Sequence, residues 1–159
     1  STQEVFSTLA ANFSDLAIQA GSVVADTLKP FAEFLDKNLV THGSCDQFED
    51  NPAKWEKVKF DHRVNSHCSM KGKYKIGSRD YSSWGINVKY WLHGLEQSNK
   101  TAVKRVVVLH SWNAVKNNEV YPNFSPLSWG CPAVSNEFMK KLDIRLQKSE
   151  KPVLLWIIE

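Results

Sequence analysis

Two short segments of the chain, 106–109 and 153–158, are apolar on both faces. A strand of this composition is buried between two layers, because neither of its faces tolerates water. Alternation of apolar and polar side chains, together with short β-type runs, predicts further strands at 38–41, 54–60, 71–76 and 86–92. The sequence therefore predicts a fold organised around a β-sheet.

Two other segments have helical spacing. Residues 2–38 carry apolar side chains at steps of three and four, interrupted at Gly21 and Pro30, and this pattern predicts one broken helix or two shorter ones. Residues 135–148 repeat the spacing with Ser135 as N-cap. The expected fold class is mainly β (α+β), with a helical segment at 1–38 and a mostly β domain at 39–159 that contains one late helix.

The composition excludes several classes of protein. A length of 159 residues fits one domain, and 42% hydrophobic with 23% charged residues is typical of globular chains rather than disordered ones. A net charge of +3 without a basic cluster gives no support for nucleic acid as a partner. The sequence has no run of 18 apolar residues, so no transmembrane helix is predicted.

A histidine and a cysteine stand at positions suited to catalysis. His110 ends the buried strand, where a ring nitrogen can act as a general base. Cys131 follows Gly130 in a tight turn, and backbone N–H groups around Trp129 and Gly130 are candidates to bind an oxyanion. Composition alone leaves the alternative open that Cys131 is a buried structural cysteine and His110 a core histidine.

Ordered motifs around these residues resemble the L,D-transpeptidase superfamily. The segment 107–111 reads Val-Val-Leu-His-Ser, and 128–134 reads Ser-Trp-Gly-Cys-Pro-Ala-Val. Together with His-Gly-Leu-Glu at 93–96 and His-Gly-Ser-Cys at 42–45, these motifs are similar to the murein L,D-transpeptidase catalytic domain family. The resemblance extends from about residue 39 to residue 158.

The resemblance implies a β-sandwich-like fold and a cysteine mechanism without a cofactor. Independently of it, no three histidines have the spacing of metal ligands on one element, so no metal is expected. By position, Cys131 is the nucleophile, His110 is the base, and the backbone carbonyl of Ser111 orients the histidine. His93, His42 and Trp129 are candidates for substrate binding. The order of histidine before cysteine argues against a papain-like protease, in which the cysteine comes first.

The implied activity is a peptidoglycan L,D-transpeptidase, an L,D-carboxypeptidase, or both. The partner is then a peptidoglycan stem peptide, and the expected location is the periplasm or cell envelope of a bacterium, with the protein exported. Carbapenems are expected to acylate such an enzyme. Two alternatives are a non-catalytic cell-wall-binding module of the same fold and a cysteine hydrolase that acts on another amide.

The remaining cysteines lie in loop-like segments. Cys131 must remain a free thiol to act as a nucleophile, so any disulfide is expected to join Cys45 and Cys68. Two unpaired cysteines are the alternative, because pairing does not follow from sequence alone.

Overall fold

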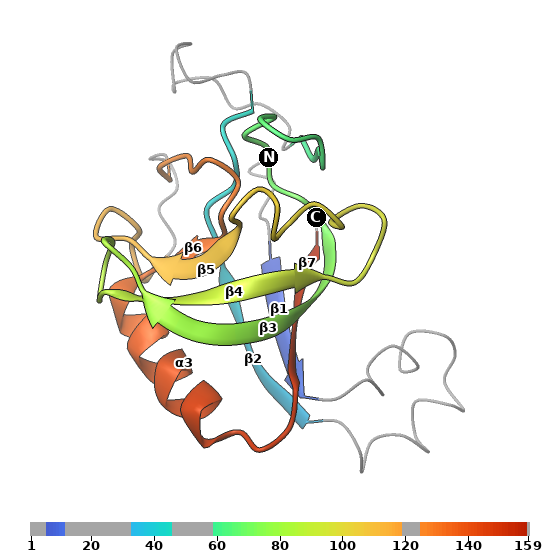
Figure 1. Ribbon diagram of the computed structural model, residues 1–159. Coiled ribbons are helices and arrows are strands. Elements are labelled where there is room, and N and C mark those ends of the chain that lie inside the picture. The colour runs from blue at the N-terminus through green and yellow to red at the C-terminus, as the bar shows by residue number, and fades with distance from the viewer. Residues whose placement is uncertain (1–5, 12–32, 46–58, 119–124, 159) are drawn as a thin grey trace.

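A single curled sheet carries most of the structure. The computed structural model describes residues 6–11, 33–45, 59–118 and 125–158 (Figure 1). The strands are β1 (Phe6–Ala11), β2 (Glu33–Leu39), β3 (Gly72–Tyr81), β4 (Val88–Gly94), β5 (Val108–Ser111), β6 (Ala133–Val134) and β7 (Val153–Ile158). Their order in the sheet is β2-β1-β7-β3-β4-β5-β6. Neighbouring strands are antiparallel, except that β5 and β6 run parallel.

The core lies inside the curl of this sheet and against the helix α3 (Asn136–Lys148). Figure 1 shows β1, β2 and β7 crossing behind β3 and β4, with α3 along one side. The large side chains that are at most 2% exposed come from the sheet, its connections and α3, and include Met70, Tyr74, Leu92, Leu109, Met139, Leu142 and Leu155. The predicted mainly β fold class is confirmed.

The helix expected over residues 2–38 is wrong wherever the structure describes that segment. Residues 6–11 and 33–39 form β1 and β2, and β1 lies between β2 and β7 in the sheet. Spacing alone does not decide the structure of these residues, because a short apolar run fits a helix and a buried strand equally well. Hydrogen bonding to strands distant in sequence decides it in favour of the sheet. The rest of the expected helical segment, residues 12–32, lies outside the described residues.

Other predicted elements are found. Helix α3 begins after Ser135, whose hydroxyl accepts a hydrogen bond from the Phe138 N–H at 3.1 Å, as an N-cap does. Strands β3, β4, β5 and β7 lie at or near their expected positions. Most of the strand expected at 54–60 lies outside the described residues.

A polar anchor ties α3 to the sheet. The Asp143 carboxylate accepts hydrogen bonds from the Tyr90 hydroxyl at 2.7 Å and from Arg79 Nε and Nη2 at 2.8 and 3.1 Å. These charge-assisted contacts, those of Arg79 above all, lower the pKa of the Asp143 carboxyl. The anchor fixes α3 against β3 and β4.

Replacing Asp143 by Ala is expected to lower the free energy of unfolding by about 1–3 kcal/mol at pH 7, because Tyr90 and Arg79 lose their acceptor. Since the folded-state pKa lies below the ordinary value of 3.8, the contribution is present above that pH and disappears as pH falls through the folded-state pKa. Urea unfolding at several pH values measures the difference. Lys141→Ala, which removes only the exposed pair with Glu137, is the control and is expected to cost under about 0.5 kcal/mol. Equal losses for the two variants would contradict the anchor.

Candidate active site

The parallel pairing of β5 and β6 brings His110 and the cysteine loop together. His110 lies opposite Ala133 in the register of these strands, and its N–H donates to the Pro132 carbonyl at 3.4 Å. Cys131 stands just before this pair, at the point where the chain turns into β6. Two residues that are distant in sequence are thus brought to the same end of the sheet.

The segment 41–45 holds the cysteine loop from the other side. The Thr41 hydroxyl donates to the Cys131 carbonyl at 3.4 Å and accepts from the Ala133 N–H at 3.1 Å. The Ser128 N–H donates to the His42 carbonyl at 2.9 Å, and the Ser44 N–H donates to the Ser128 carbonyl at 2.8 Å. These contacts fix the backbone on both sides of Cys131.

A disulfide also helps to fix the backbone around Cys131. Cys45 is bonded to Cys68, the pair expected if any disulfide forms, and Cys131 is the free cysteine. Gly130 packs directly on the Cys68 carbonyl: a Cβ at position 130 would lie 2.6 Å from that oxygen and 2.7 Å from Arg105 Nη2. The φ angle of Gly130 is +102°, a conformation that favours glycine, so the turn before Cys131 requires this residue.

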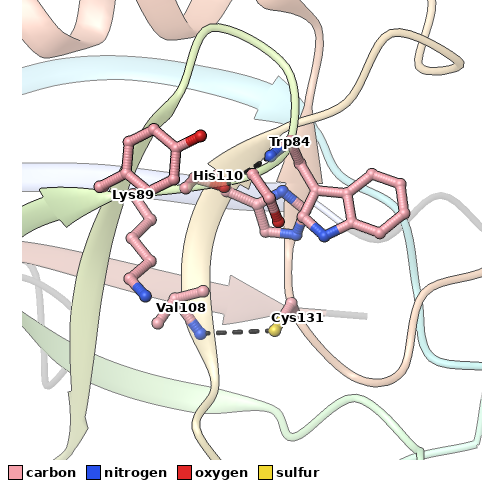
Figure 2. A pocket seen from close by; sticks show the side chains of 8 residues that line it. Trp84, Lys89, Val108, His110 and Cys131 are labelled. Atoms are coloured by element: carbon pink, nitrogen blue, oxygen red, sulfur yellow. Dashed lines mark hydrogen bonds between the residues drawn. The ribbon is translucent and has the colours of Figure 1, made fainter.

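The residues around Cys131 and His110 form one open pocket of about 350 Å³, within the range usual for small-ligand sites. Figure 2 shows these two side chains and their neighbours from close by. The lining residues are Tyr81, Ser82, Ser83, Trp84, Lys89, Val108, His110 and Cys131. The Trp84 indole is 53% exposed and meets the Trp112 ring edge-on, with centroids 5.7 Å apart.

The His110 ring is oriented by the next residue. Its Nδ1 donates to the Ser111 carbonyl at 3.0 Å, which assigns the proton to Nδ1 and leaves Nε2 with a lone pair when the ring is neutral. Burial lowers the pKa of His110 below its ordinary value of 6.5, partly offset by this hydrogen bond. The ring is therefore neutral at pH 7 and able to accept a proton at Nε2.

The Cys131 thiol rests against the start of β5. It donates to the Val106 carbonyl at 3.7 Å and accepts from the Val108 N–H at 3.5 Å (Figure 2). Burial raises the pKa of the thiol above its ordinary value of 9.0, while the Val108 N–H and the cations Arg105 and Lys89 act in the opposite direction. At pH 7 the sulfur is a neutral thiol, and proton transfer to His110 requires it to leave the Val106 carbonyl.

Two basic residues near the site carry no expected role from the sequence. The Arg105 guanidinium donates to the carbonyls of Asp61 and Cys68 at 2.9 and 2.7 Å, beneath Gly130. Lys89 on β4 pairs with His110 on β5 and lines the pocket. The alternation along β4 predicts that Lys89 lies on the face of the strand turned away from the core. Its position opposite His110, however, depends on the register between β4 and β5, which the sequence does not reveal.

Three expected substrate-binding side chains, those of His42, His93 and Trp129, are not among the residues that line this pocket. The His42 ring donates through Nδ1 to the Gly43 carbonyl at 3.1 Å. His93 is exposed farther along β4 and packs over Gly77. Trp129 is 64% exposed and faces the His67 ring, with centroids 5.1 Å apart. The roles of these three residues in substrate binding stay predictions.

The Gly130 N–H, expected to serve an oxyanion, donates to the Ser128 hydroxyl at 3.1 Å in the free protein. The oxyanion role of the Gly130 and Trp129 N–H groups also stays a prediction. In the part of the chain that the structure describes, no three His, Cys, Asp or Glu side chains gather as a metal site would require.

Comparison with known protein families identifies the family to which this chain belongs. The family model described as L,D-transpeptidase catalytic domain matches residues 23–156, which is most of the chain. The chain belongs to the L,D-transpeptidase catalytic domain family. No curated protein matches the sequence.

Membership in the L,D-transpeptidase family supports a transferase function on peptidoglycan in general terms. The family is generally associated with the cell envelope. None of the helices in the described ranges has the length and apolar character needed to cross a lipid bilayer.

Proposed function

We propose that this protein is a peptidoglycan L,D-transpeptidase, with or without L,D-carboxypeptidase activity, that acts through a thioester on Cys131. The observation that carries the proposal is the shared pocket of Cys131 and His110, with the His110 ring held by the Ser111 carbonyl. A neutral imidazole and a neutral thiol in the same pocket form the resting state that general-base activation of a nucleophile requires.

The proposed reaction begins with a stem tetrapeptide as acyl donor. His110 Nε2 takes the thiol proton as the Cys131 sulfur attacks the carbonyl carbon of the third residue. The carbon–nitrogen bond to the terminal D-alanine then breaks, and the His110 imidazolium donates its proton to the leaving amine. The donor acyl group remains on sulfur as a thioester.

The second half-reaction resolves the thioester. An amine of another stem attacks it and forms a 3→3 cross-link, or water attacks it and releases the shortened stem. In either case His110 takes a proton from the attacking group and returns it to the Cys131 thiolate. Since this substrate lies outside the cytoplasm, export to the cell envelope is part of the proposal.

Incubation with purified disaccharide-tetrapeptide muropeptides tests the proposal. Mass spectrometry of the products is expected to show loss of the terminal residue together with a cross-linked dimer or a tripeptide. Intact-protein mass spectrometry is expected to show one carbapenem adduct, located at Cys131. Absence of both products and adduct would favour a non-catalytic cell-wall-binding module, and turnover of another amide alone would favour a different cysteine hydrolase.

The pH dependence of kcat/KM and of Cys131 alkylation is expected to distinguish a neutral Cys131–His110 pair from a thiolate–imidazolium pair. Protonation of His110 removes the base, so kcat/KM is expected to rise with pH through a pKa below 6.5. Alkylation of Cys131 by iodoacetamide follows the thiolate and is expected to rise only through a pKa above 9.0. Alkylation that is already maximal at pH 5 would show that Cys131 and His110 rest as a thiolate–imidazolium ion pair instead. The Cys131→Ala variant gives the background alkylation to subtract.

A further inference from the structure

Lys89 faces the two reacting side chains from the neighbouring strand. In the register of β4 and β5 it lies directly opposite His110, so the two side chains project from the same face of the sheet. It lines the pocket together with Cys131, and Figure 2 shows its side chain extending along the pocket beside Val108. A cation is thus built into the wall next to the nucleophile.

Among the described residues, the Lys89 ammonium forms a loose ion pair with the Asp80 carboxylate and lies 5.4 Å from the centroid of the Trp91 ring. The ammonium lies 3.7 Å from Asp80 Oδ2, beyond hydrogen-bonding distance, and the Asp80 side chain is 49% exposed. Asp80 is itself held by other donors, since its oxygens accept from the Tyr81 N–H at 2.7 Å and from Trp91 Nε1 at 3.2 Å. The Lys89 ammonium has three donors and retains capacity for a further acceptor.

The surroundings of Lys89 favour an anion as that acceptor. No carboxylate stands among the described residues that line the pocket, where the other side chains are aromatic, hydroxyl and aliphatic groups and the Cys131 thiol. The Lys89 side chain is 22% exposed, so its charge is only partly screened by water. The same charge lowers the pKa of both His110 and Cys131, as expected of a cation close to both.

The proposed donor carries a carboxylate close to the bond that breaks. The scissile bond joins the third residue of the stem to a terminal residue, and one residue spans about 3.8 Å between Cα atoms. The terminal carboxylate therefore lies within one residue of the carbon that Cys131 attacks. On this basis, which rests on the function proposed above, we propose that Lys89 binds the terminal carboxylate of the leaving residue and selects donors whose chain ends there.

Two donors that differ in one group test this assignment: the disaccharide tetrapeptide with a free terminal carboxylate and the same molecule with a terminal carboxamide. The wild-type protein is expected to prefer the free acid by roughly tenfold or more in kcat/KM, the usual size of a hydrogen bond to a charged group. In Lys89→Met this preference is expected to fall close to one, and in Lys89→Arg it is expected to persist. Most of the loss is expected in KM, because the contact is made in the bound substrate as well as in the transition state.

A ratio between two donors separates binding from reactivity. Any effect of Lys89 on the ionisation of His110 or Cys131 acts equally on both donors and cancels, as does partial unfolding of a variant. Lys75→Met is the matched control, because Lys75 pairs with His93 on the same sheet and does not line the pocket. Its donor preference is expected to equal that of the wild type.

The outcomes keep the two proposals apart. Equal use of both donors by the wild type, or an unchanged preference in Lys89→Met, would overturn the role of Lys89 and leave the transpeptidase assignment standing. The third residue of the stem can be a diamino acid whose side chain ends in a second carboxylate. Equal use of the two donors, with a loss of turnover when that side-chain carboxylate is amidated, would assign the anion site to it and would also overturn the proposal. Failure of the wild type to turn over either donor would overturn the proposed function itself.

Discussion

Cys131→Ala is expected to abolish turnover of the tetrapeptide donor, with a loss of about 10⁴-fold or more in kcat. Removing the nucleophile of a covalent mechanism leaves only the rate enhancement that comes from binding and oxyanion contacts. The fold is expected to survive, because the thiol is half-buried and its contacts are with the backbone at Val106 and Val108. Product analysis by mass spectrometry and thermal unfolding measure the two quantities.

Cys131→Ser is the companion variant, since it keeps a nucleophilic atom of lower reactivity in the same place. Both variants are expected to lose the carbapenem adduct and to unfold within a few degrees of the wild type. Retention of turnover by the alanine variant would remove Cys131 from the mechanism. Loss of the folded state in both variants would show that Cys131 is a structural residue.

Removing the disulfide by Cys45→Ala and Cys68→Ala together is expected to lower the free energy of unfolding by about 3 kcal/mol. The two cysteines are separated by 23 positions, and opening a loop of that length returns chain entropy to the unfolded state. For a domain of this size the loss corresponds to a fall of about 6–12 °C in Tm.

The rate of tetrapeptide turnover is expected to fall in this double variant, along with its free energy of unfolding. Cys45 closes the segment that holds the cysteine loop through Thr41 and Ser44, and the Cys68 carbonyl supports both Gly130 and Arg105. A reductant is expected to lower the Tm of the wild type and to leave that of the double variant unchanged. Thiol counting on denatured, unreduced protein is expected to give one thiol, and a count of three would show that the bridge does not form.

The elements that sequence predicted well are those in which local pattern and tertiary environment agree. Helix α3 combines an N-cap at Ser135, an acidic first turn and basic residues in its last turn, so every local preference favours a helix. Strand β4 alternates buried side chains with partly exposed or exposed ones because one face meets the core. Strand β1 was predicted wrongly because its identity depends on β2 and β7, which pair with it from distant parts of the chain.

The site residues also divide into those with a local sequence signature and those defined only by partners distant in sequence. Cys131 and His110 stand out because a glycine turn and a strand end have local signatures, and their motifs resemble a known family. Lys89 was missed because its relation to His110 exists only in the register of β4 and β5. Arg105 was missed because its partners are backbone carbonyls of Asp61 and Cys68, which have no signature in sequence.

The half-exposed indole of Trp84 at the pocket wall has a practical consequence. Its ring lies beside the residues that are proposed to react, in edge-on contact with Trp112. An acyl group on the Cys131 sulfur replaces water near this indole with substrate atoms, and the emission of tryptophan responds to such a change in polarity. The protein therefore carries an intrinsic fluorophore at the wall of the proposed reaction centre, and a change in its emission is expected to accompany formation and decay of a thioester.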